Sequence, residues 1–187
     1  MRAKEPINKK TGIVTTVRAC DIPAQSALDQ RQIDTAYFRD SYCTPLKGLD
    51  TGVIEIFVAV FGHHPTWVKM LLIGRNWLAR VCGLDAATTD EVAHPRFKSS
   101  FRVGEKIGPW PIFALTENEL IAGRDNTHLD FRLSILRLNK TPNPTAVVST
   151  ICTVHNIFGK IYLFFILPFH MWGIQRLIAN AVAAGRL

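Results

Sequence analysis

The chain has 187 residues, of which 48% are hydrophobic and 20% are charged, and its formal net charge is +7. This composition excludes an intrinsically disordered chain and is typical of one globular domain with a sizeable core. A basic balance suits nucleic acid or anionic lipid, but no basic run is interleaved with aromatic residues, so we expect no nucleic-acid binding.

The N-terminal segment differs from the rest of the chain. Residues 1–12 form a basic, flexible tail by composition, and residues 13–187 are expected to form a single domain. No apolar run follows the tail, so the segment does not resemble a signal peptide and a cytoplasmic location is predicted. The cysteines have no zinc-type or C-x-x-C spacing, so we read them as reduced, buried thiols and predict no metal or cofactor (Cys20, Cys43, Cys82 and Cys152).

The first part of the domain gives weak signals. Residues 13–17 form a first strand or a linker, and residues 21–31 form a loop or a short helix. Residues 37–42 are predicted as an edge strand that ends at Thr44-Pro45, because a residue before proline is pushed to extended geometry.

Two helices are expected next, in a helical hairpin. The first begins at Asp50 or Thr51, which can cap it, and ends at Gly62 after Phe61. The second begins at Thr66 and ends at Gly83. In both segments the apolar residues recur at intervals of three and four, as on one face of a helix.

An antiparallel meander and a last helix complete the domain. Residues 158–184 form a long apolar helix in which Pro168 should cause a kink. A membrane span needs about 20 apolar residues, and Pro168 and His170 interrupt the run here. We therefore expect a buried helix lying across the sheet. Short strands separated by turn residues precede it (113–115, 119–123, 128–138 and 147–155).

The third of these strands alternates strictly. Its side chains point to opposite faces with a period of two. One face is apolar (Leu129, Phe131, Leu133 and Ile135), and the other carries an acid, a base and an imidazole (His128, Asp130, Arg132 and Ser134). Asp130 is expected to pair with Arg132 or to orient His128. This polar face either anchors a ligand inside a cavity or is the solvent face of the sheet. Because Leu129 and Phe131 are the obvious inward residues, the alternation itself favours the solvent face.

The order of elements is that of a helix-grip fold, an α+β architecture in which a curved antiparallel sheet wraps a long C-terminal helix. Within that order the chain resembles the bacterial DUF2867 family, which is of unknown function and is grouped with the polyketide cyclase, START and Bet v 1-like superfamily (SRPBCC). The resemblance covers roughly residues 35–183. It rests on four segments (Trp67…Arg75-Asn76…Gly83-Leu84, Gly123–Ser134, His155–Tyr162 and Pro168-Phe169-His170).

The resemblance implies a cavity between the sheet and the last helix but no particular reaction. Tyr162 would then offer its hydroxyl to a ligand. His155 and His170 would lie on elements that touch. A metal site made of these two and His128 is a weaker alternative than local hydrogen bonding, such as His170 to the Phe164 carbonyl that Pro168 leaves unpaired.

We therefore predict a protein that binds a small hydrophobic molecule. Its expected ligand-binding residues are His128, Asp130, Arg132, His155, Tyr162 and His170. Two alternatives stay open: a cyclase- or hydratase-like enzyme that uses the His/Asp/Arg patch, and a peripheral membrane protein. Of partners, we expect a small apolar ligand and weak or no membrane association, and a homo-oligomer is also allowed.

Overall fold

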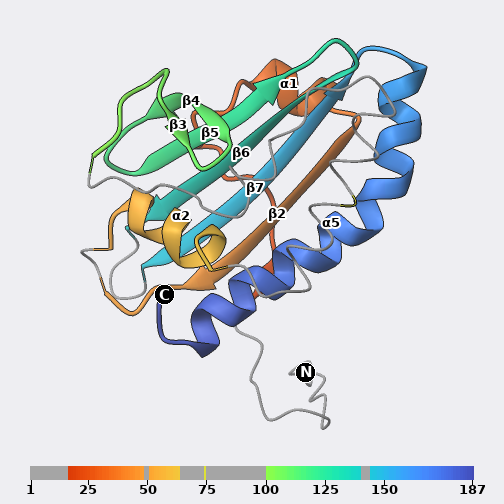
Figure 1. The fold of residues 1–187 in the computed structure, drawn as a ribbon. Coiled ribbons are helices and arrows are strands. Elements are labelled where there is room, and N and C mark those ends of the chain that lie inside the picture. Colours follow the sequence, from red (N-terminus) through yellow and green to blue (C-terminus); the bar gives the residue numbers. More distant parts are fainter. Residues whose placement is uncertain (1–16, 49–50, 64–73, 75–99, 140–143) are drawn as a thin grey trace, which may run out of the picture.

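The computed structural model describes residues 17–48, 51–63, 74, 100–139 and 144–187, which form an α+β fold around one open sheet (Figure 1). The strands of this part of the chain are antiparallel and lie in the order β1-β2-β7-β6-β5-β4-β3. Their bounds follow in chain order: β1 Arg18–Ala19, β2 Phe38–Pro45, β3 Lys106–Ile107, β4 Trp110–Leu115, β5 Glu119–Asp125, β6 Leu129–Leu138 and β7 Thr145–Val154.

Two of the helices begin and end close to the predicted signals, whereas the first helix lies mostly after residues 21–31, the segment expected to be a loop or a short helix. Helix α1 (Gln30–Thr35) is capped by the Asp29 carboxylate, which accepts from the N–H groups of Arg31 and Gln32. Helix α2 (Val53–Phe61) ends at Gly62, and α5 (Ile157–Ala183) begins after the Asn156 cap. The predicted basic tail, the strand over 13–17 and the helix over 66–83 lie mostly or wholly outside the described residues.

The predicted meander is confirmed, since β4, β5, β6 and β7 each pair antiparallel with the next. The position of β2 differs from the prediction. Residues 37–42 were expected at an edge, but β2 pairs with β7 along its whole length, and β1 pairs with its other side at Tyr42 and Cys43. The cause is the two-residue strand β1, which is too short to show a period in the sequence.

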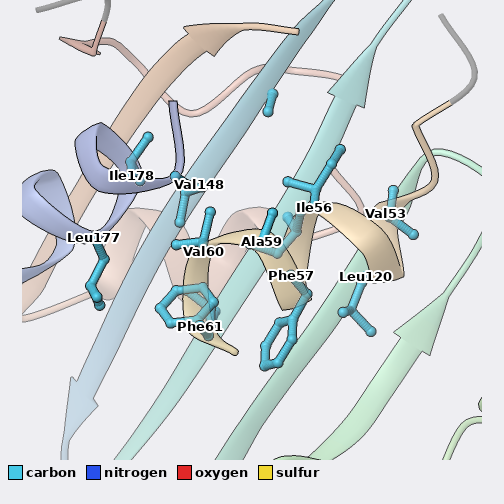
Figure 2. Close-up of a cluster of buried hydrophobic side chains, with 14 of the residues drawn as sticks. Val53, Ile56, Phe57, Ala59, Val60, Phe61, Leu120, Val148, Leu177 and Ile178 are labelled. Atoms are coloured by element: carbon cyan, nitrogen blue, oxygen red, sulfur yellow. The ribbon is translucent and has the colours of Figure 1, made fainter. Parts of the chain in front are cut away.

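One face of the sheet is covered by α2 and α5, as Figure 1 shows. Figure 2 shows the buried side chains of α2 over the strands, with Leu177 and Ile178 of α5 to one side of them. Ile56, Phe57 and Val60 of α2 meet Leu120 and Val148 of the sheet together with residues near the end of α5. Leu133 and Ile135 of β6 belong to the same cluster, so the apolar side of the alternating strand faces the helices.

The opposite face is covered near its middle by the segment before β2. Leu28 and Ile33 pack there on Ile121 and Ile151. Beside them the buried Glu119, only 3% exposed, accepts hydrogen bonds from the Ser26 hydroxyl at 2.6 Å, the Ala27 N–H at 2.5 Å and the Ser134 hydroxyl at 2.5 Å. This carboxylate therefore ties the chain before α1 to strands β5 and β6.

Helix α5 contacts the sheet most closely at its start. The Asn156 side chain accepts from the N–H groups of Phe158 and Gly159. A Cβ at Gly159 would collide with the carbonyl oxygen of His128, so only glycine allows this approach. Pro168 lies inside the helix, and Figure 1 shows α5 as a bent ribbon that passes across β2. Proline removes a backbone donor and is a common cause of such a bend.

The close approach of α5 predicts different effects for two glycine substitutions in the same helix. Gly159→Ala should lower the free energy of unfolding by about 2–3 kcal/mol, because backbone must move to admit the methyl group. Gly173→Ala is the matched control, since a Cβ there meets none of the described residues within 4 Å. It should raise stability by up to about 1 kcal/mol through helix propensity. Urea unfolding of both variants checks this, and equal effects would contradict the proposed contact.

The buried Glu119 carboxylate predicts a second contrast. Glu119→Ala leaves three donors without their acceptor, so the free energy of unfolding should fall by about 2–4 kcal/mol. Glu117→Ala is the control, because Glu117 is 85% exposed and lies 3.5 Å from Arg137. That change should stay within about 0.5 kcal/mol. Thermal or urea unfolding distinguishes the two, and a Glu119→Ala variant as stable as the control would show that the segment before α1 is held by other contacts.

Candidate functional site

The polar face of β6 does not form one patch. Arg132 pairs with Asp125 at 2.5 Å, and its guanidinium carbon lies 3.7 Å from the centroid of the Phe113 ring. His128 lies just before the strand, where its Nδ1 is 2.7 Å from the Asn156 amide nitrogen. The expected pairing of Asp130 with Arg132 or His128 is therefore replaced by contacts to other residues.

Asp130 pairs with a histidine of the neighbouring strand segment. Its Oδ2 lies 3.0 Å from Nε2 of His155, and its Oδ1 accepts the Asn126 N–H at 3.1 Å. Residues i and i+2 of one strand are about 6.5 Å apart, whereas cross-strand neighbours come closer. The pair is half-exposed, and it lies on the face away from α2 and α5, because Leu129 and Leu133 occupy the helix-covered face.

A second carboxylate–histidine pair lies beneath α5. The strand register puts Phe38, Asp40 and Tyr42 of β2 on the helix-covered face, and Asp40 is directly opposite Thr150 of β7. His170 comes down from α5, and its Nε2 is 3.3 Å from Oδ2 of Asp40. The Phe38 ring meets the imidazole edge-on, with the ring centroids 5.7 Å apart. The Asp40 side chain is 10% exposed and that of His170 is 27% exposed.

The polar atoms of this second site are buried without hydrogen bonds. Within the described part of the chain, both oxygens of Asp40, Nε2 of His170 and the hydroxyl of Thr150 have no hydrogen-bond partner. The imidazole approaches Asp40 within ion-pair distance but without the alignment of a hydrogen bond. Buried polar atoms are nearly always bonded, and leaving one unbonded costs about 1–3 kcal/mol. A cluster of such atoms points to a partner that binds there.

Tyr42 borders this cluster on the side of the main core. Its hydroxyl accepts from the Gln175 amide of α5 at 3.2 Å. Burial raises the pKa of the Tyr42 phenol, and the nearby Asp40 carboxylate raises it further. The phenol therefore stays protonated at neutral pH and keeps a hydroxyl beside Asp40. We call the set Asp40, Tyr42, Thr150 and His170 the sub-helix polar cluster.

The six residues predicted from the sequence are divided between different places. His170 joins the sub-helix polar cluster. Tyr162 is buried against Leu129, Cys152 and Leu163. Asp130 and Arg132 lie on the other face, and His155 joins Asp130 there. His170 contacts Asp40 and not the Phe164 carbonyl.

The described residues hold no group of three His, Cys, Asp or Glu side chains placed for a metal ion. The weaker alternative of a three-histidine site is not formed, because His155 and His170 pair with different carboxylates on opposite faces.

Asp40 was missed by sequence reasoning, although the signal was present. Phe38, Asp40 and Tyr42 alternate with Arg39 and Ser41 in the predicted strand. An acid between two aromatic residues on one face is unusual for a core-facing strand, because charged side chains are rarely buried without a partner. Thr150 could not be found in this way, since its place opposite Asp40 depends on the pairing of β2 with β7.

Comparison with known proteins identifies a family for this chain. A family model described as "Protein of unknown function (DUF2867)" matches residues 32–177. The chain belongs to the DUF2867 family. No curated protein and no solved structure matches it. The DUF2867 match runs from α1 into α5 and includes every residue of the sub-helix polar cluster, whereas Ser26 and Ala27, which bond Glu119, precede it.

The unbonded state of Asp40 predicts an unusual stability effect. Asp40→Asn should leave the free energy of unfolding unchanged or raise it by about 1 kcal/mol, because it removes a buried charge that lacks hydrogen bonds. Asp130→Asn is the matched control, since that carboxylate also pairs with a histidine but accepts a backbone hydrogen bond. Asp130→Asn should lower the free energy of unfolding by about 1 kcal/mol. Urea unfolding measures the stability of both variants. If Asp40→Asn lowered the free energy of unfolding by about 3 kcal/mol or more, the role of the buried Asp40–His170 pair would be to stabilise the fold.

Proposed function

We propose that this protein binds a small, largely hydrophobic molecule between the sheet and α5, and that the sub-helix polar cluster holds the molecule's polar end. The observation that carries the proposal is the set of buried polar atoms on Asp40, Thr150 and His170 that have no hydrogen bond within the described residues. The proposal places the chain among bacterial helix-grip proteins of the SRPBCC kind, as the sequence resemblance implies. A cytoplasmic location is part of the same proposal and follows from the reading of the cysteines as reduced thiols.

The surroundings of the cluster suit an apolar ligand. Phe38 contacts His170 and packs against the buried apolar cluster that includes Leu163, against which Ile166 and Leu167 of α5 also pack. Binding sites for small molecules are commonly lined by apolar and aromatic side chains, with a few polar groups that fix orientation. A hydrocarbon chain lying along this part of α5 would have its head group near Asp40.

The chemistry of the cluster selects the head group. Asp40 offers two carboxylate oxygens as acceptors, and the Thr150 hydroxyl can accept or donate. A hydrogen-bond donor, such as an alcohol or an amine, would satisfy these atoms. A carboxylate head group would instead bring two negative charges together, which raises the energy of both. The proposed ligand is therefore an amphipathic alcohol or amine.

A series of ligands with one chain length tests this preference. Octanol, octylamine and octanoate differ only in the head group, and each is added below its micelle concentration while thermal unfolding is measured. At about ten times the Kd, one-site binding adds about 1.4 kcal/mol, which raises Tm by about 3–5 °C. We expect this rise with octanol and octylamine and little with octanoate.

Two variants make the ligand test specific. Asp40→Asn should abolish most of the rise caused by octylamine, because the charged acceptor is lost. Asp130→Asn should keep it, since Asp130 lies on the opposite face of the sheet. Equal Tm rises for all three compounds, or an unchanged octylamine effect in Asp40→Asn, would reject the sub-helix polar cluster as the binding site. Native mass spectrometry of freshly purified protein identifies any ligand that copurifies.

A further inference from the structure

Helix α5 carries a second apolar stripe that faces away from the sheet. Its exposed members recur at helical spacing over about four turns and lie on one side of the helix. Phe164 is 73% exposed and Trp172 is 55% exposed. The stripe, which we call the outer stripe, consists of Ile157, Ile161, Phe164, Phe165, Phe169 and Trp172.

The outer stripe is additional to the side of α5 that packs on the sheet. Tyr162, Leu163, Ile174 and Ile178 are buried on the inner side. By length and composition α5 could cross a membrane. The core helix of a soluble protein can have the same composition but is mostly buried, whereas only 22% of the most apolar window of α5 is buried inside the protein. A helix that is apolar on both sides is typical of a position between two apolar environments. The sheet supplies one of them, and the exposed side chains of the outer stripe face the other.

The charges on α5 indicate the nature of the second environment. The 27 residues of the helix include no Asp or Glu, while Lys160 and Arg176 are exposed near the two ends of the outer stripe. The whole chain carries a formal charge of +7. Aromatic side chains flanked by cations are the composition of helices that lie in the interface of anionic bilayers. A protein partner would need acidic groups placed to match these two cations, whereas an anionic bilayer supplies them everywhere.

The contacts of the inner side determine how α5 meets a bilayer. Gln175 bonds the Tyr42 hydroxyl, His170 pairs with Asp40, and the end of the helix is part of the main core. The helix therefore cannot cross a membrane without leaving the sheet. With these contacts intact, the outer stripe can only lie flat against a surface.

We propose that α5 docks the folded protein onto the surface of an anionic lipid bilayer through the outer stripe, with Lys160 and Arg176 contacting lipid head groups. The proposal is independent of the small-molecule site, because the residues involved lie on opposite sides of α5. It accounts for the exposure of several large aromatic side chains side by side. Such a patch gives no advantage to a protein that stays in water.

Vesicle co-sedimentation of the full chain tests the proposal. The protein is mixed with phosphatidylcholine vesicles, either pure or containing about one-third phosphatidylglycerol. We expect it to sediment with the anionic vesicles and to be released by salt. The double variant Phe164→Gln/Phe169→Gln should weaken binding by at least about tenfold, because two interfacial aromatic groups are lost. Lys160→Glu/Arg176→Glu should weaken it similarly, because their attraction becomes repulsion.

A matched control removes exposed apolar groups elsewhere. Tyr37 and Val103 are 52% and 60% exposed and lie outside α5. Tyr37→Gln/Val103→Gln should bind vesicles as the wild type does. Circular dichroism of all variants verifies folding, which these exposed positions should not disturb.

Four results would overturn the proposal. Absence of sedimentation with anionic vesicles would do so directly. Binding that the Phe164/Phe169 variant leaves unchanged would move the contact elsewhere. A dimer in solution that this variant converts to a monomer, without vesicle binding, would make a second copy the occupant of the outer stripe. Protection of Phe164 and Phe169 from hydroxyl-radical labelling in a lipid-free monomer would assign their cover to residues 64–99 of the same chain.

Discussion

The packing of α5 on the sheet is the contact on which the other features of this protein depend. One end of the helix enters the main core through Ile174, Leu177 and Ile178, and the other is held against the start of β6 at Gly159. Each fully buried side chain of this size contributes about 1.5–3 kcal/mol. These two attachments enclose the stretch around Pro168 and His170, so the polar groups of β2 beneath it are kept from water. Without this helix Asp40 would be an ordinary solvated acid.

The two carboxylate–histidine pairs show how the same residue types acquire different properties from their positions. Asp130 and His155 lie near a turn where a backbone N–H completes the hydrogen bonding of the carboxylate. Asp40 and His170 lie between a strand and a helix, where neither oxygen of the carboxylate is bonded within the described residues. A satisfied pair near solvent contributes little to stability. An unsatisfied one under a helix is a stability cost, which is typical of residues that serve binding.

Much of the fold could be predicted from the sequence because its signals are local. Gly62 ends α2, and the period of two in 128–135 identified β6. The partners of the polar side chains could not be predicted, because they depend on which strands are neighbours. Asp130 meets His155, and Asp40 meets Thr150, only through pairings with β7 that join segments far apart in the chain. The inward direction of Leu129 was predictable from its apolar face, and this removed Asp130 and Arg132 from the helix-covered side.

The two proposed functions use opposite sides of α5 and are physically related. Its inner side lies over polar atoms that have no hydrogen bond within the described residues, and its outer side presents exposed aromatic groups. A hydrophobic molecule dissolves poorly in water, so a protein that binds one gains access to it at a bilayer, where such molecules concentrate. With α5 flat on that surface, the distance between lipid and the sub-helix polar cluster is no more than the thickness of one helix, about 10 Å. The bend at Pro168 lies at the level of His170, where the missing backbone hydrogen bond makes local opening of the helix least costly.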